Sequence, residues 1–425
     1  MRVLLVGGGG REHALAWKIS QSERLTKLYV APGNAGTGEV AENVNIRATD
    51  FEGLARFAAA GAIDMLVVGP EEPLVNGIRD YFEADGRFAS LMIVGPGRAG
   101  ARLEGSKDFA KGFMTRHGIP TAAYLAVTRE NLAEGIAFLR RQRPPHVLKA
   151  DGLAAGKGVL IVEDPDEAAR ELVLMLDGKF GEAGRRVVIE EFLRGIELSV
   201  FALTDGEGYK ILGSAKDYKR AGEGDTGLNT GGMGAVSPVP FADEAFNRKV
   251  EERVVRPTVE GLRTEGIAYK GFIFFGLMNE GGEPRVIEYN VRLGDPETEV
   301  VVPRLKGDVL SLFEAMAAGD LSLAACEEDP RFCATVMLVA GGYPGPYGRG
   351  AEITGLPDTR GELVFHAGTA REGDRVVTSG GRVIAAGARG DTLEEALRGA
   401  YEVAGKIRFE GKNYRADIGN DLKRF

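Results

Sequence analysis

The stretch Lys149-Ala-Asp-Gly-Leu-Ala-Ala-Gly-Lys-Gly158 joins two segments of strand-like composition, Val147 to Lys149 and Val159 to Val162. Its glycines let backbone N–H groups approach an anion, and its lysines add positive charge. It is not a Walker A loop, because only three residues separate Gly152 from Gly156 and Gly158 replaces the required Ser or Thr. Taken alone, it fits a flexible hairpin with solvated lysines equally well. With its neighbours, it predicts an anion-binding loop in a sheet.

A second motif is the strand-like stretch Arg285-Val-Ile-Glu-Tyr-Asn-Val-Arg292. Strand alternation predicts two different faces. The mainly polar face would carry Val286, Glu288, Asn290 and Arg292, and the apolar face would carry Ile287, Tyr289 and Val291. Oxygens of Glu288 and Asn290 suit Mg²⁺ held together with substrate phosphates, and Arg292 would meet a transferring phosphoryl group. The alternative is the solvent face of an amphipathic strand. The polar loop from Gly294 to Glu299 that follows favours the metal-nucleotide site.

A polar, glycine-rich segment lies between these two motifs. Asp217-Tyr-Lys-Arg220 is followed by Asp225-Thr-Gly-Leu-Asn-Thr-Gly-Gly-Met-Gly234. We interpret the second stretch as a long loop that is too varied for a hairpin turn. Ordered loops of this length are often functional.

The first hundred residues alternate apolar strand segments with helical patterns, which predicts a doubly wound parallel sheet. Loops such as Gly7 to Gly10 follow the strands and would gather at the carboxyl edge, where ligands of such sheets bind. A nicotinamide-dependent oxidoreductase is disfavoured, because the third glycine of the dinucleotide fingerprint is missing and the second strand ends in Ala31-Pro-Gly33 without a ribose-binding acid.

The composition restricts the class of protein. The chain has 425 residues, of which 44% are hydrophobic, and a formal net charge of -9, which argues against general affinity for nucleic acid. No apolar run approaches the roughly 20 residues that span a bilayer, and no signal segment is seen, so we expect a cytoplasmic protein without a membrane partner. Cys326 and Cys333 are expected to be reduced and buried, and none of the four histidines has the spacing of a metal site or catalytic triad.

Three domains are predicted: an N-terminal α/β domain at 1–102, a catalytic α+β body at 103–325 and a small C-terminal α+β domain at 326–425. Within the catalytic body, residues at about 121–188 would form a subdomain able to move as a lid.

In order and spacing, five motifs resemble those of ATP-grasp ligases: Glu104 to Lys107, the 149–158 loop, Glu190 to Leu193, the 225–234 loop and Glu288 to Glu297. Within that superfamily the chain is most similar to the phosphoribosylamine-glycine ligase family, from Gly8-Gly-Gly-Arg-Glu-His-Ala14 to Ala340-Gly-Gly-Tyr-Pro-Gly345. The resemblance covers essentially the whole chain and implies a central ATP-grasp fold with a mobile lid.

The resemblance also implies roles for individual residues. Those expected at ATP are Lys107, Lys149, Gly152, Gly156, Lys157, Gly158, Glu190, Glu191, Phe192, Leu193 and Glu197. Glu288 and Asn290 would hold Mg²⁺ or Mn²⁺, and Lys149, Asp217 and Arg292 would act in catalysis. The expected substrate contacts are Gly9, Gly10, Arg11, Glu12, Asn34, Asp217, Arg292, Pro296 and Glu297. Phe274 and Phe275 occupy the place of a further acidic metal ligand in many ATP-grasp enzymes, Leu228 replaces a common proline, and Ile196 replaces a common glutamate.

The implied reaction is the second step of de novo purine biosynthesis. ATP would activate the carboxylate of glycine as glycyl phosphate, and the amine of 5-phosphoribosylamine would attack it, giving glycinamide ribonucleotide, ADP and phosphate. This chemistry needs cations, a metal and exclusion of water, but no protein nucleophile. We expect a monomer. The alternatives are another ATP-grasp carboxylate-amine ligase or carboxylase and, more distantly, the oxidoreductase or a noncatalytic nucleotide sensor.

Overall fold

Five strands at the N-terminus form a parallel sheet with the order β3-β2-β1-β4-β5. The computed structural model describes residues 1–152, 158–357 and 363–425 of the chain. The predicted doubly wound sheet is confirmed, and its strands are β1 (Arg2–Gly7), β2 (Lys27–Pro32), β3 (Glu42–Asn43), β4 (Met65–Val68) and β5 (Met92–Val94). Its helices include α1 (Gly10–Ile19), α2 (Thr37–Val40), α3 (Phe51–Gly61), α4 (Glu71–Val75), α5 (Ile78–Glu83) and α6 (Arg98–Gly105). The loop after β1 therefore leads directly into α1.

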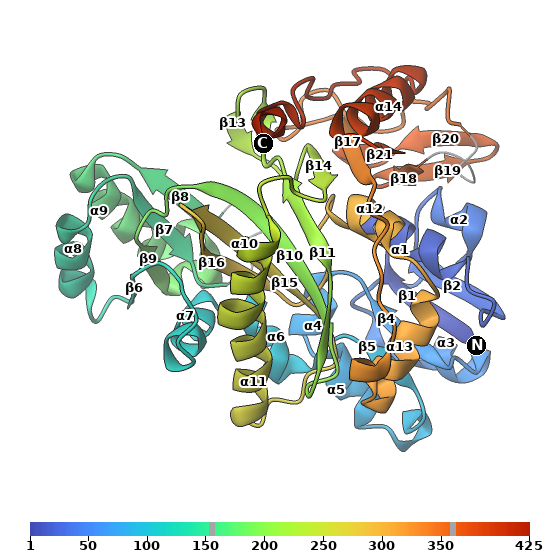
Figure 1. Ribbon diagram of the computed structural model, residues 1–425, viewed down its shortest axis with the longest axis horizontal. Coiled ribbons are helices and arrows are strands. Elements are labelled where there is room, and N and C mark those ends of the chain that lie inside the picture. The colour runs from blue at the N-terminus through green and yellow to red at the C-terminus, as the bar shows by residue number, and fades with distance from the viewer. Residues whose placement is uncertain (153–157, 358–362) are drawn as a thin grey trace.

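A second, antiparallel sheet of four strands forms a lobe that projects from the rest of the molecule, at the left of Figure 1. Its strands, in the order β6-β9-β7-β8, are β6 (Tyr124–Val127), β9 (Val187–Glu190), β7 (His146–Ala150) and β8 (Val159–Val162). Helices α8 (Leu132–Arg141) and α9 (Pro165–Leu174) pack on it, and the lobe has its own apolar core. We call this lobe the 124–190 subdomain. Helix α7 (Lys107–Arg116) precedes it.

The third sheet has eight antiparallel strands, in the order β16-β15-β10-β11-β14-β17-β21-β18. Its strands are β10 (Ile196–Thr204), β11 (Tyr209–Asp217), β14 (Gly234–Ser237), β15 (Gly271–Glu280), β16 (Glu283–Asn290), β17 (Phe332–Val339), β18 (Leu363–His366) and β21 (Arg382–Gly390). Strands from the C-terminal part of the chain thus continue the sheet of the central part. The C-terminal part adds the hairpin of β19 (Thr369–Glu372) and β20 (Arg375–Thr378) and helix α14 (Leu393–Lys406).

Alternating side chains of the sheets form two large apolar cores. Val3, Leu5, Phe201 and Phe274 belong to one core, whereas their sequence neighbours Leu4, Val6, Val200 and Phe275 belong to the other. Helices α10 (Glu244–Val250) and α11 (Arg256–Thr264) cover the second core, and α12 (Thr298–Val301), α13 (Val309–Ala318) and α14 lie on the first. The two cores pack against opposite faces of these sheets and so fix the positions of strands such as β1, β10 and β15.

The interpretation of the 225–234 segment as a loop unsuited to a hairpin is wrong. Strands β12 (Arg220–Gly222) and β13 (Thr226–Asn229) form an antiparallel hairpin. Gly224 in its turn has φ +65° and Gly227 just after the turn has φ +79°, conformations that glycine adopts without strain, and Asp225 between them has φ +55°, a region that Asp adopts more readily than most residues. The hairpin was hidden because both strands are short, polar and exposed or half-buried.

Candidate functional site

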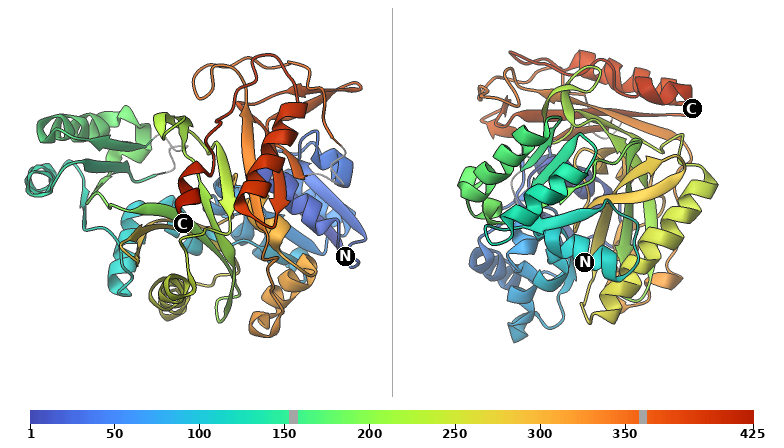
Figure 2. Two further views of the ribbon diagram at one scale, coloured as in Figure 1. Left: turned by 45° about the horizontal axis from the view of Figure 1, so that its top comes forward. Right: turned by 90° about the vertical axis from the view of Figure 1, so that its left-hand side faces the viewer.

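Glu288 and Asn290 lie at the end of β16, where the eight-stranded sheet meets the 124–190 subdomain. The junction is marked by the Nζ of Lys149 on β7, which donates to the carbonyl of Ile287 at 3.3 Å, and by a bridge between Thr121 and Val286. Figure 2 shows the subdomain standing over this edge of the sheet. Lysines and carboxylates from separate elements therefore converge here.

Three lysines surround the Glu288 carboxylate. Burial opposes its ionisation, yet Lys219, Lys149 and Lys107 hold the pKa of Glu288 below its usual value. Lys107, the first residue of α7, donates to the carbonyl of Gly152 at 3.3 Å, and burial lowers its pKa. Opposite Glu288 on β15 is Gly276, where a Cβ would lie only 3.1 Å from the Glu288 Cγ. The carboxylate is thus held ionised in a closely fitted place.

The predicted faces of this strand need one correction. A β-bulge between Gly276 and Leu277 interrupts the register with β16, so that Val286 joins Tyr289 and Val291 in the core instead of sharing the face of Glu288. Ile287 lies outside that core, in a small separate apolar cluster. The extra residue of a bulge shifts the alternation by one position. Pairing is regular from Gly276 to Phe274, so Glu288 and Asn290 do share a face.

Glu190 at the end of β9 lies between two lysines. Its Oε1 is 3.0 Å from the Nζ of Lys149, and its Oε2 is 2.9 Å from the Nζ of Lys111. All three side chains are at most 6% exposed. Lys111 was not among the predicted residues, although its spacing of four from Lys107 on a helix places both on one face.

A small apolar cluster beside this network is suited to a flat ring. Leu193, Ala122 and Met278 are buried there, and Ile287 packs against them, apart from the large cores. The neighbouring side chain of Glu191 pairs with Arg285 at 3.1 Å, and Arg194 lies over the ring of Phe192. Glu197, half exposed on β10, accepts from Lys219 at 3.0 Å and raises its pKa well above the usual value.

Two further carboxyl groups, Asp217 at the end of β11 and Glu297 at the start of α12, interact. Burial and Asp217 raise the pKa of Glu297 to about 7, and burial and Glu197 raise that of Asp217. Ser199 donates to Glu297 at 3.2 Å. A buried carboxyl pair of this kind favours a cationic ligand.

Arg292 follows β16 and is held by carboxylates from the N-terminal part of the chain. Its Nη2 lies 3.0 Å from Glu104 on α6 and its Nε 3.4 Å from Glu71 on α4. The other oxygen of Glu104 accepts from the backbone N–H of Val291 at 2.8 Å. The side chain of Arg292 is nevertheless 18% exposed.

The predicted substrate-binding side chains at the N-terminus are bonded within the protein. Glu12 accepts from the backbone N–H of Gly9 at 2.6 Å and from Arg11 at 2.6 Å, and Arg11 also donates to the carbonyl of Leu293. Asn34 donates to the carbonyls of Gly8 and His366. These side chains shape the glycine-rich loop, which presents its backbone.

Asp295 and Glu299 form a carboxyl pair between three parts of the chain. Asp295 accepts from the backbone N–H of Arg11 at 3.2 Å and pairs with Arg382 of β21 at 3.0 Å. Glu299, with no exposed surface, interacts electrostatically with Asp295 and lies against Gly10, where a Cβ would be 2.3 Å from the Glu299 Oε1. Burial and Asp295 raise the pKa of Glu299 well above its usual value, whereas Arg382 and Arg11 keep that of Asp295 low against the effect of burial. Glu299 is therefore protonated.

Glu299→Gln will raise the melting temperature at pH 8 relative to the unchanged protein, by a few degrees. The unfolded glutamate ionises near its usual pKa and the folded one does not, so this residue lowers stability progressively as the pH rises from that value. The amide has nearly the same shape and stays neutral at both pH values. Scanning calorimetry at pH 5 and pH 8 measures the effect, which shrinks at pH 5, and Glu252→Gln, at an exposed position, provides the control. An equal loss of stability at both pH values would show that Glu299 is ionised.

Gly156 and Lys157 lie outside the described residues, and Gly158, just before β8, is buried. Pro296 packs on Gly232, where a Cβ would meet its ring at 2.3 Å. Phe274 and Phe275 are buried in the two cores, so neither place offers an acidic ligand.

Of the two reduced cysteines, Cys333 is buried as predicted, but Cys326 is only partly buried. Within residues 1–152, 158–357 and 363–425, no three His, Cys, Asp or Glu residues are grouped to hold a metal by themselves.

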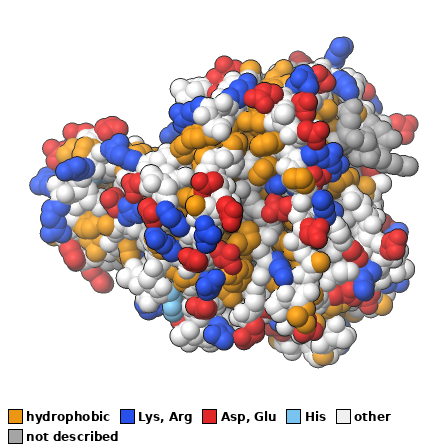
Figure 3. Space-filling view, viewed as in Figure 1, with side chains coloured by type: hydrophobic (Ala, Val, Ile, Leu, Met, Phe, Trp, Pro, Cys, Tyr) orange, Lys and Arg blue, Asp and Glu red, His pale blue; other side chains and the backbone are white. Residues whose placement is uncertain are grey.

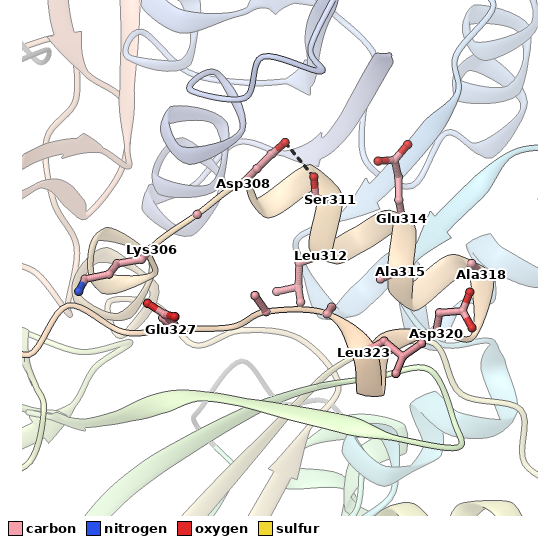
Figure 4. A pocket seen from close by; sticks show the side chains of 13 residues that line it. Lys306, Asp308, Ser311, Leu312, Glu314, Ala315, Ala318, Asp320, Leu323 and Glu327 are labelled. Atoms are coloured by element: carbon pink, nitrogen blue, oxygen red, sulfur yellow. Dashed lines mark hydrogen bonds between the residues drawn. The ribbon is translucent and has the colours of Figure 1, made fainter.

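A surface cavity of ≈ 700 Å³ lies elsewhere, between α13 and the chain that follows it (Figure 4). All its lining residues fall between Lys306 and Glu327, and Asp308 there accepts from Ser311 at 3.0 Å. On the face shown in Figure 3, Lys and Arg side chains are interspersed with Asp and Glu. None of the helices in the described part of the chain has the length and hydrophobicity needed to cross a bilayer.

Comparisons with known proteins cover nearly the whole chain. Three family models match it, those of the N domain, the ATP-grasp (A) domain and the C domain of phosphoribosylglycinamide synthetase, at residues 1–104, 105–298 and 333–421. The phosphoribosylamine-glycine ligase of Vibrio cholerae is 48% identical over 425 residues, covering 99% of this chain and 98% of that protein. The one from Chlorobaculum tepidum is 48% identical over 427 residues, covering 99% of each.

Solved structures agree with these relatives. The phosphoribosylamine-glycine ligase of Thermotoga maritima matches with a TM-score of 0.85 and 39% identity, covering 98% of this chain and 100% of the other. A biotin carboxylase from Campylobacter jejuni matches with a TM-score of 0.73 but only 14% identity, covering 100% of this chain and 98% of the other. The second likeness shows the shared fold alone.

Proposed function

The chain belongs to the phosphoribosylglycinamide synthetase family, and we infer from this membership that it is an ATP-dependent ligase of purine biosynthesis, joining glycine to 5-phosphoribosylamine. The products are glycinamide ribonucleotide, ADP and phosphate. The observation that carries the inference at the site is the convergence of Lys107, Lys149, Glu288 and Asn290, contributed by three separate elements. Positive charge there is what a triphosphate requires.

We propose that the reaction proceeds through glycyl phosphate. A carboxylate oxygen of glycine attacks the γ-phosphorus and ADP leaves; the amine of phosphoribosylamine then attacks the carbonyl carbon, loses a proton, and phosphate leaves. Lys107 and Lys149 would bind the phosphates, with Gly152, Gly156, Lys157 and Gly158 in the covering loop, and Arg292 would stabilise the transferring phosphoryl group. Glu190, Glu191, Phe192 and Leu193 would surround adenine, and Glu197 the ribose. The small apolar cluster at Leu193 supports this placement.

Glu288 and Asn290 fit a divalent metal, which we propose to be Mg²⁺ or Mn²⁺. Glu288 is kept ionised, and both oxygens point from one face of β16. A carboxylate and an amide oxygen are hard ligands that suit Mg²⁺ when substrate phosphates complete the shell. When bound, the metal supplies neutralisation of phosphate charge. The residues present need no third acid, which agrees with the apolar Phe274 and Phe275.

We assign the ammonium group of glycine to Asp217 and Glu297. Their carboxyl groups interact, and both have raised pKa values that a bound cation would lower. Phosphoribosylamine would then lie between this pair and the loop of Gly9 and Gly10, with Arg11, Glu12 and Asn34 supporting that loop from within. Pro296, packed on Gly232, would also contact it. The N–H groups at the start of α1 suit its phosphate.

The KM for glycine will fall about tenfold as the pH rises from 6 to 8, because ionisation of Glu297, with its pKa of about 7, completes the anionic pair. Glu297→Gln will raise this KM and flatten the profile. Initial rates at saturating ATP and phosphoribosylamine measure both effects. If the KM for glycine of Glu297→Gln fell with pH as steeply as that of the unchanged enzyme, the titrating group would be another residue.

We further propose that the domains run 1–102, 103–325 and 326–425, that the subdomain at about 121–188 moves as a lid, and that the protein acts as a cytoplasmic monomer. The separate core of the 124–190 subdomain supports movement as a unit. Closure would exclude water from glycyl phosphate.

One assay tests the function. ADP release is measured with ATP, Mg²⁺, glycine and freshly generated phosphoribosylamine, omitting each component in turn. All four are expected to be required for full turnover. ADP formation that is indifferent to glycine would overturn the proposal in favour of another ATP-grasp ligase or carboxylase.

A further inference from the structure

Lys111 is a buried cation that the proposed reaction does not use directly. Only 2% of its side chain is exposed, and its Nζ contacts Oε2 of Glu190 at 2.9 Å and donates to the hydroxyl of Thr121 at 2.8 Å. That hydroxyl donates in turn to the carbonyl of Val286 on β16 at 2.6 Å. Lys111 is therefore fixed to both the subdomain and the strand that carries Glu288.

The other carboxylate oxygen of Glu190, Oε1, forms an ion pair with the Nζ of Lys149. Their separation is 3.0 Å, and Lys149 is further directed by its bond to the carbonyl of Ile287. One carboxylate thus serves two buried ammonium groups, which leaves one net positive charge in the trio. The nearby Arg285 adds no unpaired positive charge to the trio, because its guanidinium pairs with Glu191 and Glu280.

This arrangement controls how much of its charge Lys149 can offer to a ligand. If Glu190 were paired with Lys149 alone, the two charges would cancel in a region of low dielectric constant, and the attraction for a phosphate would weaken. The bond from Lys111 also fixes the orientation of the Glu190 carboxylate, because without this partner the carboxylate would turn toward the nearest other donor. Burial, and to a smaller extent the second lysine, lower the pKa of Lys111 to about 8 despite the opposing effect of Glu190.

We propose that Lys111 is a positioning residue for nucleotide binding: it holds the Glu190 carboxylate so that Lys149 keeps its net positive charge and its direction toward the phosphates of ATP. This inference rests on the proposed role of Lys149 in the ligase reaction. It assigns Lys111 an effect on ATP affinity that is exerted entirely through Glu190.

A double-mutant cycle tests it, with Lys111→Met, Glu190→Gln and the double variant, in the full-length enzyme. We expect Lys111→Met to raise the KM for ATP and the Kd of MgADP by about tenfold or more, with kcat and the KM for glycine changed less than about twofold. In the Glu190→Gln background the same substitution should change the KM for ATP less than about twofold, because no carboxylate remains to be held. MgADP binding is measured by calorimetry.

Two controls separate the possible failures. Lys179→Met, an exposed lysine on the same subdomain paired with Glu171, should leave every constant unchanged. The double variant removes one cation and one anion and so keeps the single net positive charge of the trio, on Lys149, which makes it informative if Lys111→Met folds poorly. An unchanged KM in Lys111→Met, an equal effect in both backgrounds, or a loss confined to kcat would overturn the proposal. If instead Lys149→Met leaves the KM for ATP unchanged, the assigned role of Lys149 itself fails.

Discussion

Glu288→Gln will lower kcat/KM for ATP by about 10²–10³-fold, with little change in the unfolding temperature. The substitution keeps the shape that fits against Gly276 and removes the negative charge that β16 presents to Lys107, Lys149 and Lys219. A neutral amide binds a divalent cation more weakly, so saturation will need more Mg²⁺. Initial rates of ADP release across a Mg²⁺ titration, at several fixed ATP concentrations, measure both changes.

Glu283→Gln is the matched control for this experiment. Glu283 lies at the other end of β16, about half exposed, and pairs with Lys249 and Arg253. Its loss should affect neither the rate nor the Mg²⁺ dependence, since surface ion pairs contribute little. A Glu288→Gln enzyme with unchanged Mg²⁺ dependence would remove this residue from the metal site.

Arg292→Met is expected to damage both stability and activity. Its removal leaves Glu104 buried without its cation, and breaking such a pair costs about 3–5 kcal/mol of unfolding free energy. Burial already raises the pKa of Glu104 while Arg292 lowers it, so the variant's Glu104 will take up a proton more readily. Urea unfolding at pH 7 and ADP release measure the two losses.

Arg292→Met combined with Glu104→Gln separates the two roles. The second substitution removes the unpaired charge, so most of the stability should return, while activity should stay low because no guanidinium faces the phosphoryl group. Recovery of activity together with stability would mean that Arg292 acts only as a structural partner of Glu104.

Local patterns predicted most strands of the fold, but not the polar ones. Runs such as Val3 to Val6 are buried on both faces, so their composition alone identifies them. β11 alternates buried and half-exposed residues imperfectly, and β14 has only four residues, Gly234–Ser237. Their strand conformation comes from neighbours in the eight-stranded sheet, which the local sequence does not contain.

The same limit applies to the site. Glu288 and Asn290 were found because both lie on one strand and their relation follows from a two-residue period. The bulge opposite them was missed, since it depends on pairing with β15. Glu104 and Arg292 are 188 residues apart, and their contact exists only after the sheets assemble. Lys111 was within reach of the sequence, but its task depends on Glu190, a distant partner on β9.

The pairing of β14 with β17 makes the central and C-terminal parts of the chain depend on each other for folding. A boundary drawn between residues 325 and 326 cuts through four residue pairs of one continuous sheet. Asp217 pairs with Ala235 of β14, so it stands two strands away from β17. The third family region is therefore not a detachable module. A protein lacking it would expose β14 as an open sheet edge, prone to pair with other chains, next to the strand that carries Asp217.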